Sequence, residues 1–348
     1  MAFEPIATER LLLRGPTLDD LDPLTARRSD PDVARYQSWT APYPRERARE
    51  LLADVSTMAG PELDRWWLAT VCERGSGDVL GDVAVQLSEH GNVAEIGYTF
   101  AADHWGKGFA TEAVEAICGH LFLAAGVGRV WATLAPENLA SARVLEHTGF
   151  LFEGRGRLSH WPDPDADPAE GPGDDLRYAM TRADWQAWRE RPTGQPNRVR
   201  LVEITSANQR AVAELVTHKS QERFVAPVSR SYGDALFPHV ENGVAVEPMM
   251  RAIEADGVLA GFMLVALRTP RYGEPYLWRL LIDRSHQRRG IGSLALDQLE
   301  DRLRRDGHRA IFVSWGPGSD SPAPFYLDRG FEPTGRGSMG ETNARKQL

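Results

Sequence analysis

Apolar and polar positions alternate in short runs that are separated by helical repeats along the whole 348-residue chain. In the first half, three apolar-rich runs are joined by glycine-containing turns, which predicts an antiparallel meander. The expected elements are strands at 65–74, 78–88 and 93–101, a helix from about Gly108 to Ala125, a strand at 129–135, a helix ending at Gly149 and a strand at 150–158. This interleaving favours a mixed α/β (α+β) sheet flanked by helices over a bundle or a sandwich.

The second half repeats the same order of elements. Two strands across a turn (249–268) precede a third (275–283), a helix after Gly290, a strand (310–315), a short helix ending at Gly330 and a last strand (331–336). The repeat indicates a duplication at the scale of a domain. Because the chain is longer than a single core usually allows, we expect domains at 1–189 and 199–348, joined by a Pro- and Gly-containing linker at 190–198.

Each half places a glycine-rich turn between its third strand and the following helix. The turns read WGKGFA (Trp105–Ala110) and QRRGIG (Gln287–Gly292). The first N–H groups of a helix lack intrahelical acceptors, and the helix dipole adds positive charge, so such a turn favours a phosphate. In the second turn, Arg288 and Arg289 add further positive charge. The absent Gly-Lys-Ser/Thr ending argues against a P-loop, and the preceding meander argues against a Rossmann fold.

These turns resemble the pyrophosphate loop of the GNAT N-acetyltransferases, which reads Gln/Arg-x-x-Gly-x-Gly/Ala. The second turn matches completely, whereas the first has Trp105 at the Gln/Arg position and is similar to the RimJ/RimL-type branch. Segments 135–150 and 321–335 resemble the second coenzyme segment of the family, the latter as in polyamine- and antibiotic-modifying members. The resemblance covers nearly the whole chain and implies two tandem GNAT-like domains that use acetyl-CoA as co-substrate and need no metal.

The resemblance also implies coenzyme contacts at the end of the third strand, in the glycine-rich turn and in the second coenzyme segment. In the first domain these residues are Tyr98, Thr99, Phe100, Trp105, Gly106, Lys107, Gly108, Phe109, Ala110, Thr111, Asn138 and Ser141. In the second domain they are Leu280, Leu281, Ile282, Gln287, Arg288, Arg289, Gly290, Ile291, Gly292, Ser293 and Tyr326. Asn138 could instead cap its helix, and the sequence leaves both roles open.

Direct attack of an amine on a thioester needs a route for the amine proton and a proton for the leaving thiolate. Tyr326 lies in the family's general-acid register, with a core aromatic as the alternative. The first domain has no tyrosine there, so Ser141 is its candidate donor. Glu95 is the candidate base of the first domain, or else a solvated carboxylate at a strand edge. For the second domain, Glu274, Glu222 and water all remain open.

Acceptor binding is expected from the segments at 36–44 and 221–232, which mix aromatic and polar residues. The candidates are Tyr36, Trp39, Gln221 and Phe224, which could equally be packing residues under a loop. The predicted reaction is acetylation of a primary amine on a small molecule such as an antibiotic, an amino sugar, a polyamine or an amino-acid-like acceptor. The alternatives are an acyl-CoA-binding regulatory protein with one or both domains inactive, and a peptide N-terminal acetyltransferase.

The net charge of the chain is distributed unequally between its two halves. Of the net charge of −9, residues 1–190 carry −13 and the remainder carries +4. An acidic surface disfavours nucleic acid and favours a cationic amine, although it also serves solubility. No apolar run is long enough to cross a bilayer and the N-terminus lacks a signal pattern, so we expect a cytoplasmic monomer or homodimer without a membrane partner.

Two further features argue against a metal site. Cys72 and Cys118 are far apart and lack the spacing of thiolate ligands. The Asp-rich segment at 160–175 is similar to a calcium loop in its aspartate spacing, but Pro168 occupies the position where such loops need glycine. We therefore expect this segment to be a flexible loop.

Overall fold

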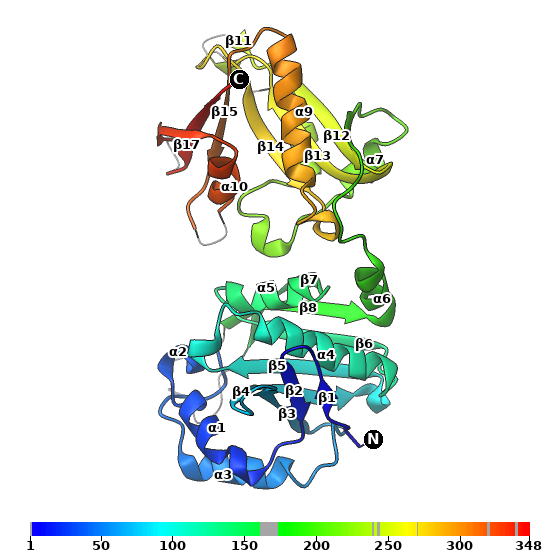
Figure 1. Cartoon of the computed structure of the whole chain (residues 1–348), viewed down its shortest axis with the longest axis vertical. Coiled ribbons are helices and arrows are strands. Elements are labelled where there is room, and N and C mark those ends of the chain that lie inside the picture. The colour runs from blue at the N-terminus through cyan, green and yellow to red at the C-terminus, as the bar shows by residue number, and fades with distance from the viewer. Residues whose placement is uncertain are drawn as a thin grey trace. The chain divides into compact units, whose positions relative to one another are not determined.

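The computed structural model describes residues 2–160, 173–238, 240–241, 244–269, 271–318, 321–337 and 340–348. The chain divides into two compact units, Met1–Glu190 and Arg191–Leu348, and each is described here by itself (Figure 1). The Asp-rich segment considered above for calcium lies almost entirely outside the described residues.

The first unit is a mixed sheet with helices on both faces. Its strand order is β1-β2-β3-β4-β5-β6-β8-β7, and β5 and β6 are the parallel neighbours. The strands are β1 (Ile6–Ala7), β2 (Leu11–Arg14), β3 (Trp66–Glu73), β4 (Val79–Ser88), β5 (Val93–Phe100), β6 (Arg129–Leu134), β7 (Leu151–His160) and β8 (Gly173–Thr181). The helices are α1 (Leu21–Arg28), α2 (Pro31–Ala34), α3 (Arg45–Val55), α4 (Phe109–Leu123), α5 (Leu139–His147) and α6 (Arg182–Glu190).

The strand order of the second unit, counted from its first strand, matches that of the first unit counted from β2. That order is β9-β12-β13-β14-β15-β17-β16, with β14 and β15 parallel. The strands are β9 (Val199–Val202), β12 (Pro248–Ala255), β13 (Val258–Ala266), β14 (Tyr276–Ile282), β15 (Ala310–Trp315), β16 (Glu332–Arg336) and β17 (Thr342–Gln347), with a separate ribbon of β10 (Val240–Glu241) and β11 (Val244–Ala245). The helices are α7 (Gln209–Ala213), α8 (Val228–Leu236), α9 (Ile291–Arg305) and α10 (Ala323–Asp328).

The mixed α/β class and the internal duplication expected from the sequence are confirmed. The three-strand meander of each half, the long helix after the glycine turn and the strand that follows it all occur within a few residues of the expected bounds. The sequence did not predict β8 and β17, which insert between β6 and β7 and between β15 and β16.

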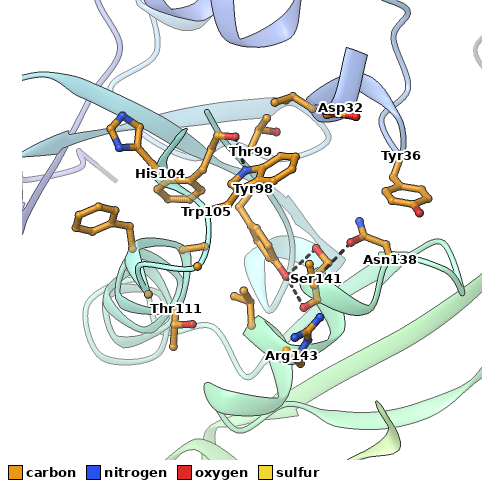
Figure 2. A pocket seen from close by; sticks show the side chains of 18 of the residues that line it. Asp32, Tyr36, Tyr98, Thr99, His104, Trp105, Thr111, Asn138, Ser141 and Arg143 are labelled. Atoms are coloured by element: carbon orange, nitrogen blue, oxygen red, sulfur yellow. Dashed lines mark hydrogen bonds between the residues drawn. The ribbon is translucent and has the colours of Figure 1, made fainter. Parts of the chain in front are cut away.

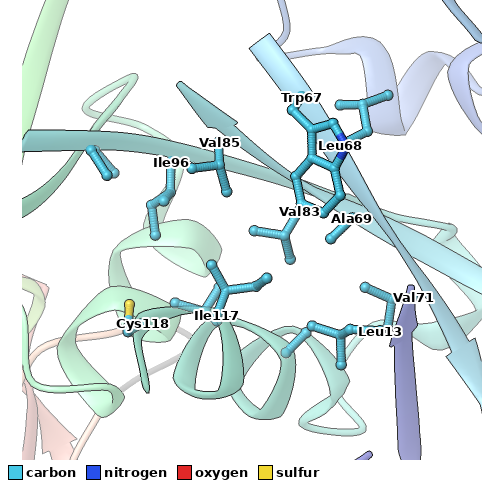
Figure 3. Close-up of a cluster of buried hydrophobic side chains, with 14 of the residues drawn as sticks. Leu13, Trp67, Leu68, Ala69, Val71, Val83, Val85, Ile96, Ile117 and Cys118 are labelled. Atoms are coloured by element: carbon cyan, nitrogen blue, oxygen red, sulfur yellow. The ribbon is translucent and has the colours of Figure 1, made fainter. Parts of the chain in front are cut away.

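Successive side chains of a strand point to opposite faces of the sheet, so both faces of the first sheet present side chains on which helices pack. Val83 and Ile96 belong to the apolar cluster that packs on Ile117 of α4 (Figure 3). The neighbouring Asp82 therefore points to the other face, where it forms a buried ion pair with Arg27 of α1. Leu21 and Leu24 of α1 and Leu52 of α3 also belong to this cluster. The core therefore covers both faces of the sheet, with α4 on one and α1 and α3 on the other, beside a buried ion pair.

The second sheet is covered in the same way. Leu277 and Val313 pack in one cluster with Leu296 of α9, whereas Phe262 and Leu264 pack in another with α7 and α8. One face of this sheet therefore belongs to α9 and α10, and the other to α7 and α8.

In both units the two parallel strands pair over a short stretch and then separate. Strand β5 pairs with β6 at Val93, Ala94 and Glu95, and β14 pairs with β15 at Tyr276 and Leu277. Beyond these positions the carboxyl ends of β5 and β14 have no parallel partner among the described strands. Each sheet therefore opens where the glycine-rich turn and its helix begin, and this opening positions the site.

Candidate active sites

A cleft of about 550 Å³ lies at the opening of the first sheet (Figure 2). It is formed by the end of β5, the glycine-rich turn, the starts of α4 and α5, and the segment around α2. Of the residues predicted for coenzyme or acceptor, Tyr36, Tyr98, Thr99, Phe100, Trp105, Gly106, Gly108, Phe109, Ala110, Thr111, Asn138 and Ser141 line it. Lys107, Trp39 and Glu95 are not among its lining residues.

The glycine-rich turn of the first unit is held from behind. Gly106 and Gly108 have φ of 73° and 81°, a region that side chains rarely adopt, and Gly108 caps the start of α4. The Arg10 side chain donates to the Lys107 carbonyl at 2.8 Å and pairs with Glu112 in the first turn of α4 at 2.7 Å. The N–H groups at the helix start are thereby presented at a fixed turn, as a phosphate site requires.

Trp105 stands where the motif has glutamine, and its indole makes the same kind of hydrogen bond as that glutamine makes in the second unit. The Trp105 indole Nε1 donates to the carbonyl oxygen of Phe100, the last residue of β5, at 2.9 Å. In the second unit, Gln287 Nε2 donates to the carbonyl oxygen of Ile282, the last residue of β14, at 3.1 Å. Both side chains therefore fasten the turn to the end of the strand that precedes it.

A phenol lies in the first cleft, from an element that the sequence did not suggest for it. Tyr98 Oη donates to the Ser141 carbonyl oxygen at 2.9 Å and accepts from Ser141 Oγ at 3.1 Å (Figure 2). Burial raises the pKa of Tyr98 far above its usual range. Asn138 Oδ1 accepts from the Ser141 N–H at 3.1 Å, so Asn138 makes the helix cap. The expectation for Tyr98 concerned only its backbone; its period-two relation to buried Ile96 could have indicated that its side chain points toward α4 and α5.

Glu95 lies three residues before Tyr98 on β5, so its side chain is on the opposite face of the sheet. The carboxyl is half-buried, and burial raises its pKa, while the nearby Arg177 guanidinium opposes that rise. Arg177 itself stacks over the Trp131 ring at 4.8 Å. A raised pKa brings a carboxylate closer to the range in which it accepts a proton from an amine.

The cleft also contains charged residues that the sequence analysis did not single out. Asp32 at the start of α2 lines it beside Tyr36, and Arg143 and His147 line it from α5. The signal for Asp32 was its place just before the expected acceptor segment. Trp39 instead donates its indole N–H to the Arg28 carbonyl and packs under the Arg28 guanidinium at 4.1 Å.

The turn of the second unit has the same backbone form with different side chains. Gly290 has φ of 74° and caps α9, and Ile291 is buried in the core, so only its backbone is available to a ligand. Arg288 is exposed, with φ of 60° at the position that Gly106 occupies in the first turn. Ser293 and Gly292 lie in the first turn of α9.

Arg289 does not extend toward a ligand as its charge suggested. Its side chain is 6% exposed, donates through Nε to the Gly194 carbonyl at 2.8 Å, and contacts His286 Nδ1 at 2.9 Å. The guanidinium therefore fastens the turn to the segment before β9, and Arg288 is the arginine of this motif that faces solvent.

Tyr326 of α10 lies in the core of the second unit. Its ring stacks on Trp315 with centroids 5.6 Å apart and meets Phe331 edge-on, so it belongs to the core. Its hydroxyl makes no hydrogen bond within the part of the chain that the structure describes, and burial raises its pKa. The proton of this phenol is thus not committed to another side chain.

The other residues predicted for the second site either contact the glycine-rich turn or interact with residues outside it. Gln221 exchanges two hydrogen bonds with Gln287, at 3.1 and 2.7 Å. Phe224 lies against Gly316 in the loop after β15. Leu281 is buried against α7 and α8, so it offers a ligand only its backbone. Two candidate bases have other partners, since Glu274 pairs with His308 and Glu222 pairs with Lys219.

Comparisons with known proteins identify the class to which this architecture belongs. A family described as "Acetyltransferase (GNAT) domain" matches residues 10–151, and "Acetyltransferase (GNAT) family" matches residues 214–331. The chain belongs to the GNAT acetyltransferases and carries two such domains in tandem, as expected; it is an acyltransferase of a family that uses acetyl-CoA.

Similar proteins include bacterial relatives and solved structures. The "Uncharacterized N-acetyltransferase p20" of Bacillus licheniformis is 32% identical over 44% of this chain and 85% of its own length. YoaA of Bacillus subtilis, also named an uncharacterized N-acetyltransferase, is 29% identical over 44% of this chain and 85% of its own length. The structure of Mycobacterium smegmatis RimJ in complex with CoA-disulfide is 22% identical, with a TM-score of 0.42, over 50% of this chain and 83% of that one.

Two features are absent from the residues that the structure describes. None of the helices there has the length and apolarity needed to cross a membrane. Within the same residues, no group of three or more His, Cys, Asp or Glu side chains is arranged to hold a metal ion.

Proposed function

We propose that the chain transfers the acetyl group of acetyl-CoA to the primary amine of a small cationic molecule, such as an antibiotic, an amino sugar, a polyamine or an amino-acid-like acceptor, and that both units are active. The observation that carries this proposal is the phenol in each opened sheet, Tyr98 in one and Tyr326 in the other, beside a fastened glycine turn. A protein that only holds an acyl-CoA has no need of a proton donor at that place.

The residues of the first turn fit the diphosphate of a coenzyme. An added Cβ at Gly106 would meet nothing within 4 Å, so the backbone there is open to a ligand. The N–H groups from Gly108 to Thr111 would bind the diphosphate, and Asn138 Nδ2 would be free to contact the pantetheine arm while Oδ1 caps α5. Acetyl-CoA, when bound, supplies the thioester carbon that the amine attacks.

In the first unit, Glu95 would accept the amine proton from the face opposite α4. The Tyr98 and Ser141 pair would supply the proton to the departing thiolate from the α4 and α5 face. Because Ser141 Oγ gives its hydrogen to Tyr98, we assign the transfer to the pair rather than to Ser141 alone. Asp32 and Tyr36, at the same cleft, would hold a cationic acceptor, and the acidity of residues 1–190 would favour its approach.

In the second unit, Tyr326 would protonate the thiolate and Arg288 would contact the diphosphate. Gln221 and Phe224 would form part of the acceptor side through the contacts of Gln221 with the turn. Loss of the general acid is expected to lower the rate about 10²-fold or more in the affected unit.

The test is release of free CoA thiol from acetyl-CoA with a panel of small amines and a panel of short peptides. We expect turnover with cationic amines, about 10²-fold slower chemistry in the affected unit for Tyr98→Phe or Tyr326→Phe, and unchanged acetyl-CoA affinity. Tyr178→Phe, which removes a phenol hydroxyl that lies outside the cleft and donates to Glu146, is the matched control that leaves chemistry intact. No thiol release by the wild type with any amine would refute the proposal, and acetylation of peptides alone would move the acceptor to protein N-termini.

A further inference from the structure

The second unit contains a chain of three hydrogen-bonded side chains that none of the assignments above uses. Tyr276 Oη and Ser314 Oγ are 2.6 Å apart, and Ser314 Oγ donates to Glu341 Oε2 at 2.7 Å. A serine hydroxyl has one hydrogen, and here Glu341 receives it. Tyr276 must therefore donate its own hydrogen to Ser314, so the three groups point in one direction, from phenol to carboxylate.

Tyr276 occupies in the second sheet the position that Glu95 occupies in the first. Glu95 pairs across the parallel strands with Trp131, the third residue of β6, and Tyr276 pairs with Phe312, the third residue of β15. Both residues stand where the parallel strands are about to separate. The second unit, which lacks a carboxylate on this strand, thus has a phenol in its place that is linked to a carboxylate on the neighbouring hairpin.

The relay lies on the face of the sheet opposite the proposed acid. Leu277 and Val313 pack in the same cluster as Tyr326, so the adjacent Tyr276 and Ser314 point to the other face. Tyr276 is nevertheless close enough that its charge contributes to the raised pKa of Tyr326. The two phenols therefore lie on either side of one opening in the sheet, as a proton acceptor and a proton donor for the same reaction should.

We propose that Tyr276, Ser314 and Glu341 form the proton relay that takes the amine proton in the second unit. The proposal rests on the function proposed above. As the amine nitrogen bonds to the thioester carbon, Tyr276 Oη takes a proton from that nitrogen and passes its own to Ser314 Oγ, which passes its own to Glu341. The carboxylate ends protonated, the C–S bond breaks, and Tyr326 gives its proton to the thiolate.

Other charged groups act on this relay from the elements packed around it. Arg279 of β14 lies near both Tyr276 and Glu341, and Asp234 of α8 pairs with Arg279 at 3.7 Å. Arg230 of α8 acts on Arg279 from the same side, and the Tyr272 ring stacks on Tyr276 with centroids 6.1 Å apart. Burial is the main cause that raises the pKa of Tyr276, so the phenol passes a proton along rather than remaining ionised.

The parent for this experiment is the full chain carrying Gly108→Val, which removes coenzyme binding by the first unit. The acceptor is an amine that the second unit acetylates. Tyr276→Phe, Ser314→Ala and Glu341→Gln are each expected to lower kcat about 10- to 100-fold, with acetyl-CoA binding by calorimetry unchanged. These losses should appear in kcat and not in the KM for the acceptor, which separates proton transfer from binding. Glu341→Asp should recover part of the rate, and Glu332→Gln, an exposed carboxylate of β16, is the matched control.

Two results would overturn the relay. Wild-type kcat in Ser314→Ala and Glu341→Gln would show that the proton leaves by another route. A parallel loss of kcat and melting temperature that Glu341→Asp does not reverse would show a structural role alone. If the parent releases thiol while the relay variants are unaffected, only the relay fails; if it releases none with any amine, the proposed function and the relay fail together.

Discussion

The glycine turns of the two units differ most at their first residue, yet that difference preserves one hydrogen bond. Trp105 and Gln287 are unlike in size, shape and polarity, and by motif the tryptophan marks the first turn as a departure. Each nevertheless donates a side-chain N–H to the carbonyl oxygen of the last residue in the preceding strand. What the turn requires is a donor that can reach that carbonyl, and two residue types meet the requirement.

The proposed catalytic groups differ in the same manner. The phenol of the first unit comes from β5 and is engaged with Ser141, whereas that of the second comes from α10 and has no hydrogen bond among the described residues. A carboxylate stands directly on β5 as Glu95, whereas the second unit reaches Glu341 through two hydroxyls. After duplication, equivalent chemistry would thus be supplied from different elements.

The largest expected effect is the loss of coenzyme binding from one unit at a time. Gly108→Val and Gly290→Val each place a β-branched residue at positive φ, where it is strained, at the cap from which the helix N–H groups are presented. We expect acetyl-CoA affinity to fall more than about 100-fold in the altered unit only. Calorimetry should give two sites per wild-type chain and one per variant. A single acetyl-CoA site in the wild-type chain would show that the two turns are not equivalent.

A smaller effect tests Glu95 as the base of the first unit by its pH dependence. Burial raises the pKa of Glu95, so its protonated form persists to higher pH than that of an exposed glutamate, and a base must be deprotonated. With the second unit silenced by Gly290→Val, kcat should fall as pH drops through this raised pKa. Glu95→Gln should lower kcat about 10- to 100-fold and remove that limb.

The matched control for this pH profile is Glu153→Gln, an exposed carboxylate of β7 that pairs with Arg129. An acid limb that survives in Glu95→Gln would assign the proton to another group.

The smallest effect tests the shared hydrogen bond itself. Trp105→Phe and Gln287→Met should each weaken acetyl-CoA binding about 3- to 10-fold, because an unpaired carbonyl costs roughly 1 kcal/mol or slightly more. Trp105→Gln restores a donor of the kind that the second unit uses and should bind within about twofold of wild type. If Trp105→Gln binds no better than Trp105→Phe, then the indole acts through its surface and the two turns are not equivalent.

Much of this architecture could be predicted from local sequence because the signals are local. Strands β3 to β5 are rich in apolar residues, and the turns carry glycines at positions that need positive φ. Strand β17 (TNARKQ) could not be predicted this way, because Ala344 is its one buried residue and it is held by backbone pairing with β15 and β16. Its place is defined only when the rest of the sheet exists.

The site residues likewise divide into those that a local sequence signal indicates and those that only the folded sheet brings together. The turn residues and Tyr326 were accessible to motif reasoning, but Ser314 and Glu341 join Tyr276 only because the sheet order brings β14, β15 and the hairpin before β17 together. The charge of Arg289 suggested a phosphate contact, and the backbone carbonyl that captures it has no signature in the sequence.

That capture affects where the chain can be cut. Gly194 accepts from Arg289, and an added Cβ at Gly290 would lie 3.1 Å from the Gln195 side chain, so residues expected to act as a free tether contact the second turn directly. A fragment beginning at Val199 would leave the Arg289 guanidinium, buried in the whole unit, without its carbonyl partner. For separate expression, the second domain should therefore begin at Arg191, and a fragment cut at Val199 would underreport its capacity to bind coenzyme.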